Sequence, residues 1–356
     1  MINFNMTKHE FITANSSNLA NIKNETVNLI VTSPPYPMVT MWDELFAALD
    51  TDIADDLKGA DGLSAFNKMH GVLDTVWEEC DRVLCSGGFV CVNIGDAART
   101  IGGNFQLYPN HSRIISKFVS MGYSVLPDIH WRKQTNAPNK FMGSGMYPAG
   151  AYVTYEHEYI LIFRKGGKRS FTGISKELRQ KSAFYWEERN TWFSDLWEIK
   201  GVNQSLQLSN SKRNKNASFP FEIPYRLINM YSVEGDTVLD PFSGLGTTAL
   251  ACIASKRNSI NTELDLQINQ IAIDNAERNI NQLNAVIDRR IKRHRDFILN
   301  LSADKKSRCY YNSYYDFAVK TRQETKLKID KIKCIKRENN IITCSYMQKS
   351  AQYMIG

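Results

Sequence analysis

A short segment, Thr-Ser-Pro-Pro-Tyr at residues 32–36, follows a run of apolar residues and contains two consecutive prolines. Proline fixes φ and lacks an N–H, so it ends a strand rather than extending it. The Ser33 hydroxyl and the Pro34 carbonyl are therefore hydrogen-bond acceptors on a rigid chain, and the prolines add no competing donor. Tyr36 adds a flat aromatic face. Residues 33–36 are the first candidate site.

A second candidate site is the glycine loop in VLDPFSGLGTTALA, residues 238–251. Here an expected strand ends at Asp240 and an expected helix begins near Thr247. Glycines between a strand and a helix let the backbone approach a ligand at the helix N-terminus. The spacing Gly244-x-Gly246-x-x-Ala249 loosely fits a dinucleotide fingerprint. Glu263 then ends the next strand, where an acidic side chain can meet ribose hydroxyls. The pattern predicts nucleoside binding, with NAD and S-adenosylmethionine both open.

Three details favour S-adenosylmethionine over NAD. The third small residue of the fingerprint is Ala249 rather than glycine. The loop places Asp240 and the aromatic Phe242 directly at the strand end. A second strand also ends in Ser33 and its prolines, a feature that hydride transfer does not require.

The elements around these segments alternate between buried strands and amphipathic helices. Strands are expected at 26–33, 87–96, 124–133, 156–167, 235–240 and 258–265, and helices at 67–84, 111–123, 247–257 and 268–291. Such alternation predicts an α/β fold with a mostly parallel sheet and helices on both faces. The tail at 325–347 reads as a basic hairpin, either appended to the fold or forming an edge of the main sheet.

Composition narrows the class of protein. The chain of 356 residues has no run of about 18 apolar residues and no N-terminal signal pattern. Its seven cysteines form no C-x-x-C pair, which fits reduced thiols, and no metal site is expected. We therefore expect a cytoplasmic protein.

Charge is segregated along the chain, beneath a net charge of +7. Residues 41–81 contain 11 acidic and 2 basic residues, whereas residues 301–356 contain 12 basic and 5 acidic ones. Residues 164–181 hold seven bases against one acid. Clustered bases suggest a polyanionic partner, although a solvated basic face would look the same.

The segments TSPPY and DPFSGLGTT together resemble motifs IV and I of the amino-DNA methyltransferases. Their order along the chain is similar to that of the β group in this family. Intermediate segments also resemble family motifs: residues 77–96 look like motifs V and VI, 156–166 like motif VIII and 218–228 like motif X. The resemblance spans about residues 27–280. It implies the Rossmann-like methyltransferase fold, S-adenosylmethionine as cofactor and double-stranded DNA as substrate. It also implies a prokaryotic cell and activity associated with its nucleoid.

The resemblance also implies roles for the two candidate sites. An exocyclic amine on an aromatic base is a poor nucleophile, so its hydrogens must be accepted while methyl moves in line from sulfur to nitrogen. Ser33 and Pro34 would accept these hydrogens, Pro35 would keep the chain rigid, and Tyr36 would stack on the flipped base. The expected cofactor residues are Asp240, Phe242, Gly244, Gly246, Thr247 and Glu263, with Phe219 closing the pocket.

The serine bears on the choice of base. In this family N4-cytosine enzymes mostly carry Ser at this position, and N6-adenine enzymes mostly Asp or Asn. Ser33 therefore favours cytosine N4, with adenine N6 as the alternative. Methylation at cytosine C5 is not expected, because that chemistry typically uses a Pro-Cys pair and none of the seven cysteines follows a proline.

Position among these motifs divides the chain into four expected parts. Residues 1–165 are the catalytic half, 166–216 the target-recognition region, 217–300 the cofactor half and 301–356 a basic C-terminal extension. Within these parts we expect phosphate contacts from seven bases: Arg164, Lys165, Lys168, Arg169, Lys212, Arg213 and Lys215. The aromatic residues Phe184, Tyr185, Trp186, Trp192 and Trp197 could form a local core, which we prefer, or stack on DNA.

Other possibilities stay open at this point. Asp96 ends a strand at the same sheet edge as Ser33, so it could serve the site or cap a helix. His111, His130 and His157 are expected to be structural. The whole chain could instead be an RNA methyltransferase or an NAD-binding enzyme. A restriction endonuclease is the expected functional partner, and a homodimer is an open alternative for the assembly.

Overall fold

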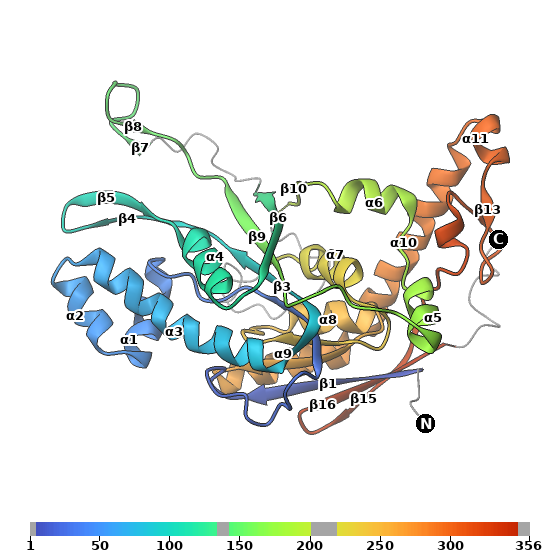
Figure 1. Cartoon of the computed structure of the whole chain (residues 1–356), viewed down its shortest axis with the longest axis horizontal. Coiled ribbons are helices and arrows are strands. Elements are labelled where there is room, and N and C mark those ends of the chain that lie inside the picture. The colour runs from blue at the N-terminus through green and yellow to red at the C-terminus, as the bar shows by residue number, and fades with distance from the viewer. Residues whose placement is uncertain (1–4, 134–141, 201–218, 348–356) are drawn as a thin grey trace.

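A ten-stranded sheet forms the centre of the protein (Figure 1). The computed structural model describes residues 5–133, 142–200 and 219–347. The sheet order is β10-β6-β9-β3-β2-β11-β12-β1-β16-β15. The strand bounds are β1 Met6–Thr13, β2 Val27–Thr32, β3 Leu84–Ile94, β6 Ser124–Arg132, β9 His157–Arg164, β10 Leu196–Glu198, β11 Thr237–Asp240, β12 Asn258–Glu263, β15 Ile332–Glu338 and β16 Ile341–Tyr346.

Strand directions confirm the expected mostly parallel sheet. Strand β2 lies between β3 and β11 and is parallel to both, and β11–β12 and β12–β1 are parallel as well. Only β9 and β16 run against the other strands of this sheet. Because β9 is reversed, its first residues lie beside the carboxyl ends of β3 and β6. That reversal decides which residues reach the site.

Helices cover both faces of the sheet, as the alternation of elements predicted. The helix bounds are η1 Thr40–Trp42, α1 Asp43–Leu49, α2 Asp52–Lys58, α3 Gly62–Val83, α4 Asn110–Ser120, α7 Glu222–Tyr231, α8 Thr247–Ala254, α9 Leu266–Arg278 and α10 Ile280–Leu299. On β2, Leu29 and Val31 belong to the core shared with α7, α8 and α9, while Ile30 belongs to the core shared with α3 and α4. This is the period-two alternation of a strand buried on both faces.

Two small hairpins extend from the same end of the molecule (Figure 1). One consists of β4 (Ala97–Ile101) and β5 (Asn104–Tyr108), and the other of β7 (Met142–Gly143) and β8 (Ala151–Tyr152). The Phe105 and Tyr152 rings stack with centroids 4.8 Å apart, so the hairpins touch. Both follow strands whose ends form the site described below.

The segment after β9 forms helix α5 (Gly173–Lys181), helix α6 (Trp186–Trp192) and strand β10. Tyr185, Trp192 and Trp197 are buried, whereas Trp186 is exposed. The local-core interpretation of these aromatic residues therefore holds for three of them. Strand β10 pairs with β6 and places Trp197 beside Trp131. The segment thus returns to the main sheet before residues 201–218, which lie outside the described ranges.

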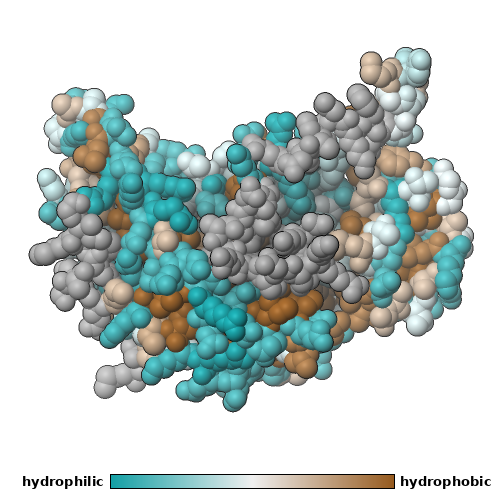
Figure 2. All heavy atoms as spheres, turned by 180° about the vertical axis from the view of Figure 1, so that it is seen from behind, coloured by the Kyte–Doolittle hydropathy of each residue, from teal (hydrophilic) through white to brown (hydrophobic). Residues whose placement is uncertain are grey.

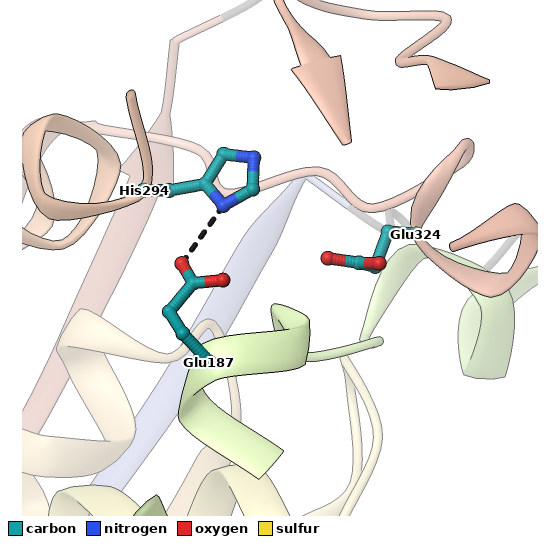
Figure 3. A group of neighbouring side chains, drawn as sticks. All are labelled: Glu187, His294 and Glu324. Carbon is teal, nitrogen blue, oxygen red and sulfur yellow. Dashed lines mark hydrogen bonds and ion pairs between the residues drawn. The ribbon is translucent and has the colours of Figure 1, made fainter. Parts of the chain in front are cut away.

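Three side chains link this segment to the C-terminal part of the chain (Figure 3). Nδ1 of His294, on α10, lies 2.8 Å from Oε1 of Glu187, and its Nε2 lies 3.0 Å from the Ala318 carbonyl. Glu324, in η2 (Arg322–Glu324), accepts the Trp186 N–H at 2.9 Å. All three residues are of types that bind metals. Each of them already bonds within the protein, so we interpret the cluster as a structural link.

The C-terminal hairpin β15–β16 is an edge of the main sheet. Strand β16 pairs with β1 from Met6 opposite Ser345 to Glu10 opposite Ile341. This was one of the two alternatives for the tail. The shorter elements before it are α11 (Ala303–Ser307), β13 (Tyr310–Tyr311) and β14 (Ala318–Val319).

The single long helix expected at 268–291 is wrong, because the chain breaks between α9 and α10 at Asn279. Nδ2 of Asn279 donates to the Asn275 carbonyl at 2.7 Å. The side chain thus takes over a carbonyl of the preceding turn, as asparagine does where it competes with helical bonding.

The face of the molecule seen in Figure 2 is largely hydrophilic, with separate hydrophobic patches. None of the helices in the described ranges combines the length and the apolar composition that a membrane crossing requires.

Candidate active site

The two sequence motifs meet at the carboxyl edge of the parallel strands. Ser33 directly follows β2, Asp240 ends β11 and Glu263 ends β12. The Thr32 hydroxyl donates to Oδ1 of Asp240 at 2.7 Å, which bonds the end of one motif strand to the end of the other. Open α/β sheets bind ligands at this edge.

A cavity of about 600 Å³ opens beside the glycine loop. Its volume lies in the ordinary range for sites that hold a cofactor. The wall contains six of the seven expected cofactor residues: Asp240, Phe242, Gly244, Thr247, Glu263 and Phe219. Sequence reasoning thus located this cavity, although residues of α1 and α3 such as Phe46 and Leu73 also line it.

Asp240 is held inside the wall of this cavity. Its carboxylate accepts the Thr32 hydroxyl, the Thr248 hydroxyl at 2.6 Å and the Phe242 N–H at 3.1 Å. Burial raises the pKa of Asp240 to about 6, and these hydrogen bonds oppose that rise. Asp240 therefore fixes the start of the glycine loop.

The Glu263 side chain lies against the glycine loop, next to Gly244. Its carboxylate accepts the Gly244 N–H at 2.9 Å and the Asp265 N–H at 3.0 Å. Burial raises the pKa of Glu263. Each carboxylate oxygen keeps a further lone pair, so the side chain can accept ribose hydroxyls while the backbone holds it in place.

Gly246 is the expected cofactor residue that does not line the cavity. Its φ of +80° is favourable only for glycine, and an added Cβ would lie 3.1 Å from Cβ of Ala272 on α9. The glycine therefore allows close helix packing and the turn into α8. The expected close approach of its backbone to a ligand stays a prediction, because Leu245 and Thr247 on either side of it line the cavity.

The polar groups of the cavity wall also fit a nucleoside cofactor. Ser243 Oγ and Thr262 Oγ1 are buried in the wall and have no hydrogen-bond partner among the described residues. Apolar side chains including Leu45, Val76 and Ile268 supply the rest of the lining. An apolar wall with a few convergent polar groups suits a ligand with one aromatic ring and polar substituents.

A second cavity of about 310 Å³ adjoins the first and contains Ser33, Pro34 and Tyr36 in its wall. Ser33, Met41, Trp42 and Phe219 line both cavities. Pro35 lines only the first. Ser33 and Phe219 therefore stand at the junction, where a group from one cavity can reach a group in the other.

The Tyr36 hydroxyl lies at the centre of a polar network in the second cavity. It donates to Oε2 of Glu158 at 2.9 Å and lies 3.1 Å from Oγ of Ser33. Nδ2 of Asn93 donates to the Tyr36 hydroxyl and to Oε2 of Glu158, each at 2.7 Å. Lys133 forms an ion pair with Oε1 of Glu158. Burial, followed by the nearby Glu158 carboxylate, raises the pKa of Tyr36 well above its ordinary value.

Asp96 bonds to the first turn of α4 and also lies in the wall of the second cavity. Its carboxylate accepts the His111 N–H at 3.0 Å near the start of α4 and lies 2.7 Å from Nδ1 of the same residue. It also lines the second cavity. His157 lines this cavity too, and burial, followed by the neighbouring His130, lowers its pKa.

Sequence reasoning missed Asn93, Glu158 and Lys133 as site residues. Asn93 is next to the last residue of β3, Glu158 is the second residue of β9, and both are buried. A buried amide and a buried carboxylate within apolar strands, at the edge that carries the motifs, were the signal available in the sequence. The antiparallel direction of β9, which brings Glu158 to that edge, was not available.

The basic residues that were expected to bind DNA and that the structure describes line neither cavity. Arg164 ends β9, so the reversed strand carries it away from the edge at which it began. Lys165 donates to the carbonyls of Asp81 and Leu84, and Arg169 forms two bonds with Asp236, just before β11. Lys168 lies between them in the chain.

Arg164, Lys165 and Arg169 thus lie toward the amino edge of the parallel strands, opposite the edge that carries Ser33, and their contact with DNA stays a prediction. Lys212, Arg213 and Lys215 lie outside the described residues.

Comparison with known proteins agrees with this geometry. A family model described as DNA methylase, for the N6 and N4 enzymes, matches residues 27–274. The chain is 50% identical over 326 residues to the Type II methyltransferase M.MthZI of Methanothermobacter thermautotrophicus, covering 91% of this chain and 90% of that protein. It is 48% identical over 276 residues to the Type II methyltransferase M.MjaI of Methanocaldococcus jannaschii, covering 74% and 90%.

Solved structures share the fold. A putative DNA modification methylase from Thermus thermophilus, complexed with S-adenosyl-L-methionine, has a TM-score of 0.59 and 29% identity, covering 76% of this chain and 95% of that one. The PvuII DNA methyltransferase (cytosine-N4-specific) has a TM-score of 0.51 and 18% identity, covering 80% and 96%. The family model spans more than half of this chain. The chain therefore belongs to the N6/N4 DNA methylase family, the S-adenosylmethionine-dependent amino-methyltransferases that its motifs resemble.

Proposed function

We propose that the protein transfers methyl from S-adenosylmethionine to N4 of cytosine at a specific site in double-stranded DNA, and so protects that DNA from a cognate restriction endonuclease. The observation that carries the proposal is the position of Ser33, which lines both the cofactor cavity and its neighbour. The relatives M.MthZI and M.MjaI are Type II methyltransferases, which supports a role in restriction-modification.

The larger cavity would hold the cofactor, which supplies a methyl group bonded to a positively charged sulfur. Glu263 would accept the ribose hydroxyls, since backbone N–H groups already fix its carboxylate. The loop from Phe242 to Thr247 would contact the methionine part at the N-terminus of α8. Phe219 would separate the cofactor from the base except where methyl passes.

The smaller cavity would hold the flipped base. Ser33 Oγ and the Pro34 carbonyl would accept hydrogen bonds from the two N–H groups of the exocyclic amine as its nitrogen becomes tetrahedral. As the N–CH3 bond forms, the S–CH3 bond breaks and the sulfur becomes neutral, and the methylated amine then loses one proton. Stacking on Tyr36 would hold the ring in place of its neighbours in the duplex. Alignment of the amine with the methyl group supplies much of the rate, because the reaction needs no covalent intermediate with the protein.

Ser33 supports cytosine N4 through the family tendency for serine at this position. Adenine N6 is the second candidate, because the matching family includes N6 enzymes and the same two acceptors would serve that amine. Membership of a DNA methylase family argues against the alternatives of an NAD-dependent enzyme and an RNA methyltransferase.

The segment 166–216 would read the DNA sequence. Strand β10 brings this segment beside Trp131, which lines the base cavity. Lys212, Arg213 and Lys215 would contact phosphates next to it, a role that positions a protein on DNA without reading its sequence.

The test is nucleoside analysis of the product. The purified protein is incubated with unmethylated bacterial DNA and methyl-labelled S-adenosylmethionine, and the DNA is digested to nucleosides for mass spectrometry. Labelled N4-methylcytidine in its deoxy form supports the proposal, and labelled N6-methyladenine replaces it with the second candidate. Transfer to RNA but not to DNA would overturn both. Sequencing of the same DNA then maps the site.

A further inference from the structure

We propose that Glu158 is a positioning residue that fixes the direction of the hydrogen bonds in the base cavity, so that Ser33 presents lone pairs, and not its hydrogen, to the target amine. The inference rests on methyl transfer to an exocyclic amine, as proposed above, and holds for cytosine and adenine alike. Glu158 lies in the segment 156–166 that resembles motif VIII, but no role was predicted for this residue from the sequence.

The direction follows from counting donors and acceptors, starting at Glu158. A carboxylate only accepts, so the Tyr36 hydroxyl must give its single hydrogen to Oε2 of Glu158, 2.9 Å away. The Lys133 ammonium contacts the other carboxylate oxygen. Glu158 is 8% exposed, so solvent offers little alternative to these partners.

Asn93 completes the arrangement. Its Nδ2 lies 2.7 Å from both Tyr36 Oη and Glu158 Oε2, and its two hydrogens serve these two acceptors. The opposite orientation of the amide would place its oxygen against the Glu158 carboxylate, which is repulsive. Asn93 thus donates a hydrogen bond to one of the two lone pairs of the Tyr36 oxygen.

One lone pair of Tyr36 is left, and Oγ of Ser33 lies 3.1 Å from it. Since Tyr36 has already given its hydrogen to Glu158, Ser33 must be the donor in this contact. The Ser33 hydrogen is then directed at Tyr36, and its lone pairs are available for hydrogens from the target amine. A serine with the reverse direction would point its hydrogen at that amine and oppose methyl transfer.

Glutamine is the informative substitution, because its amide can both donate and accept. In Glu158→Gln the amide can donate to Tyr36 and reverse the chain of hydrogen bonds. We expect the single-turnover rate at saturating DNA and cofactor to fall by roughly 10- to 100-fold, below the cost of deleting a positioned group outright. The apparent affinities for S-adenosylmethionine and DNA should change less than about threefold, because the proposed role of Glu158 is to set the direction of a hydrogen bond at Ser33 and not to hold either ligand.

The decisive test is a double-mutant cycle with Ser33. If Glu158 acts through Ser33, then Glu158→Gln should cost little further rate in a Ser33→Ala background, because no hydroxyl remains to be oriented. Glu158→Asp, which keeps an acceptor-only carboxylate, should recover part of the rate lost in Glu158→Gln. Glu277→Gln on α9 is the matched control and should keep the wild-type rate, because Glu277 is exposed, pairs with Arg337 and lines neither cavity.

The outcomes separate this inference from the proposed function. A wild-type protein that methylates no DNA would contradict the proposed function itself. An active wild type with an equally active Glu158→Gln variant overturns only the role of Glu158, and so does a full further loss in the Ser33→Ala background. If Glu158→Gln does not fold, as judged by thermal unfolding and cofactor binding, the cycle is run with Glu158→Asp and decided in the same way.

Discussion

The hydroxyl of Thr32 and the carboxylate of Asp240, 208 positions apart in the chain, are joined by a hydrogen bond of 2.7 Å. Thr32 ends the strand that leads into Ser33, and Asp240 ends the strand that leads into the glycine loop. Both residues are buried. This bond fixes the segment that we propose to bind the base relative to the loop that we propose to hold the cofactor, and an in-line transfer depends on that relation.

The raised pKa of Asp240 predicts a pH dependence of stability. Its pKa rises from 3.8 to about 6 on folding, so the folded state holds this proton more tightly than the unfolded state does. The stabilisation is therefore present below about pH 4 and is lost as the pH rises to about 6, by about 3 kcal/mol over the two units. In Asp240→Asn this contribution disappears. Denaturant unfolding of both proteins between pH 4 and 7 should show the difference, and parallel curves would contradict it.

Gly246→Val should damage both folding and cofactor binding. The residue has a φ of +80°, and the new side chain would collide with Ala272. We expect a lower melting temperature and an affinity for S-adenosylmethionine reduced more than about tenfold by calorimetry, since the loop must shift. Gly122→Val is the control, because its φ of +84° is equally strained for a side chain, a Cβ there meets nothing within 4 Å, and the residue lines neither cavity. Unchanged affinity in Gly246→Val would show that the loop does not depend on this packing.

Ser33→Ala and Tyr36→Ala should separate chemistry from cofactor binding. Loss of one positioned acceptor should reduce the transfer rate by about 100-fold or more, while calorimetry should find cofactor affinity within about threefold of wild type. Tyr36→Phe keeps the ring for stacking and should retain more activity than Tyr36→Ala. A Ser33→Ala enzyme with the wild-type rate would remove the serine from its proposed role.

The affinity for S-adenosylmethionine should fall at acidic pH. A protonated Glu263 offers one acceptor fewer to the ribose, and burial raises its pKa, so the loss should begin at a higher pH than for an ordinary glutamate. Calorimetry across the acidic range tests this. Glu263→Gln should bind more weakly and lose this part of the pH dependence. Any dependence that remains in the variant would be assigned to Asp240.

Exchange of residues 166–216 for the same segment of a related enzyme should change the sequence that is methylated and leave the methylated atom unchanged. The segment packs through Tyr185 and Trp192 against α10 and α7, so the exchange must retain these residues. Sequencing of DNA from cells that express the hybrid is the measurement. An unchanged recognition site would assign recognition to another part of the chain.

The sequence predicted the central strands and both motifs because apolar runs, glycines and prolines carry local signals. It did not reveal β1, since Thr7 and His9 occupy buried positions of that strand and interrupt its apolar alternation. These polar residues are satisfied there, as His9 lies 2.8 Å from the Thr7 hydroxyl and 2.9 Å from the Ser259 hydroxyl. Hydropathy alone cannot detect a strand of this kind.

The sequence also did not reveal how distant segments pair in the sheet or in which direction each strand runs. Glu158 and Arg164 lie on one strand, yet the reversal of β9 puts Glu158 at the site and Arg164 at the far end of that strand. Charge counting along the chain treated Arg164 and its neighbours as a DNA surface because it had no information on strand direction. A basic cluster in the sequence becomes a basic surface only where the fold leaves its members unpaired, and Lys165 and Arg169 are paired.

The most direct test of the account is the structure of the protein with S-adenosylhomocysteine and a duplex that carries its mapped site. The account predicts the cofactor product in the cavity lined by Phe242 and Glu263 and a flipped cytosine in the cavity lined by Tyr36. The N4 nitrogen should lie within hydrogen-bonding distance of Ser33 Oγ and the Pro34 carbonyl and face the sulfur. A target base that remains stacked in the duplex, or an amine held away from Ser33, would contradict it.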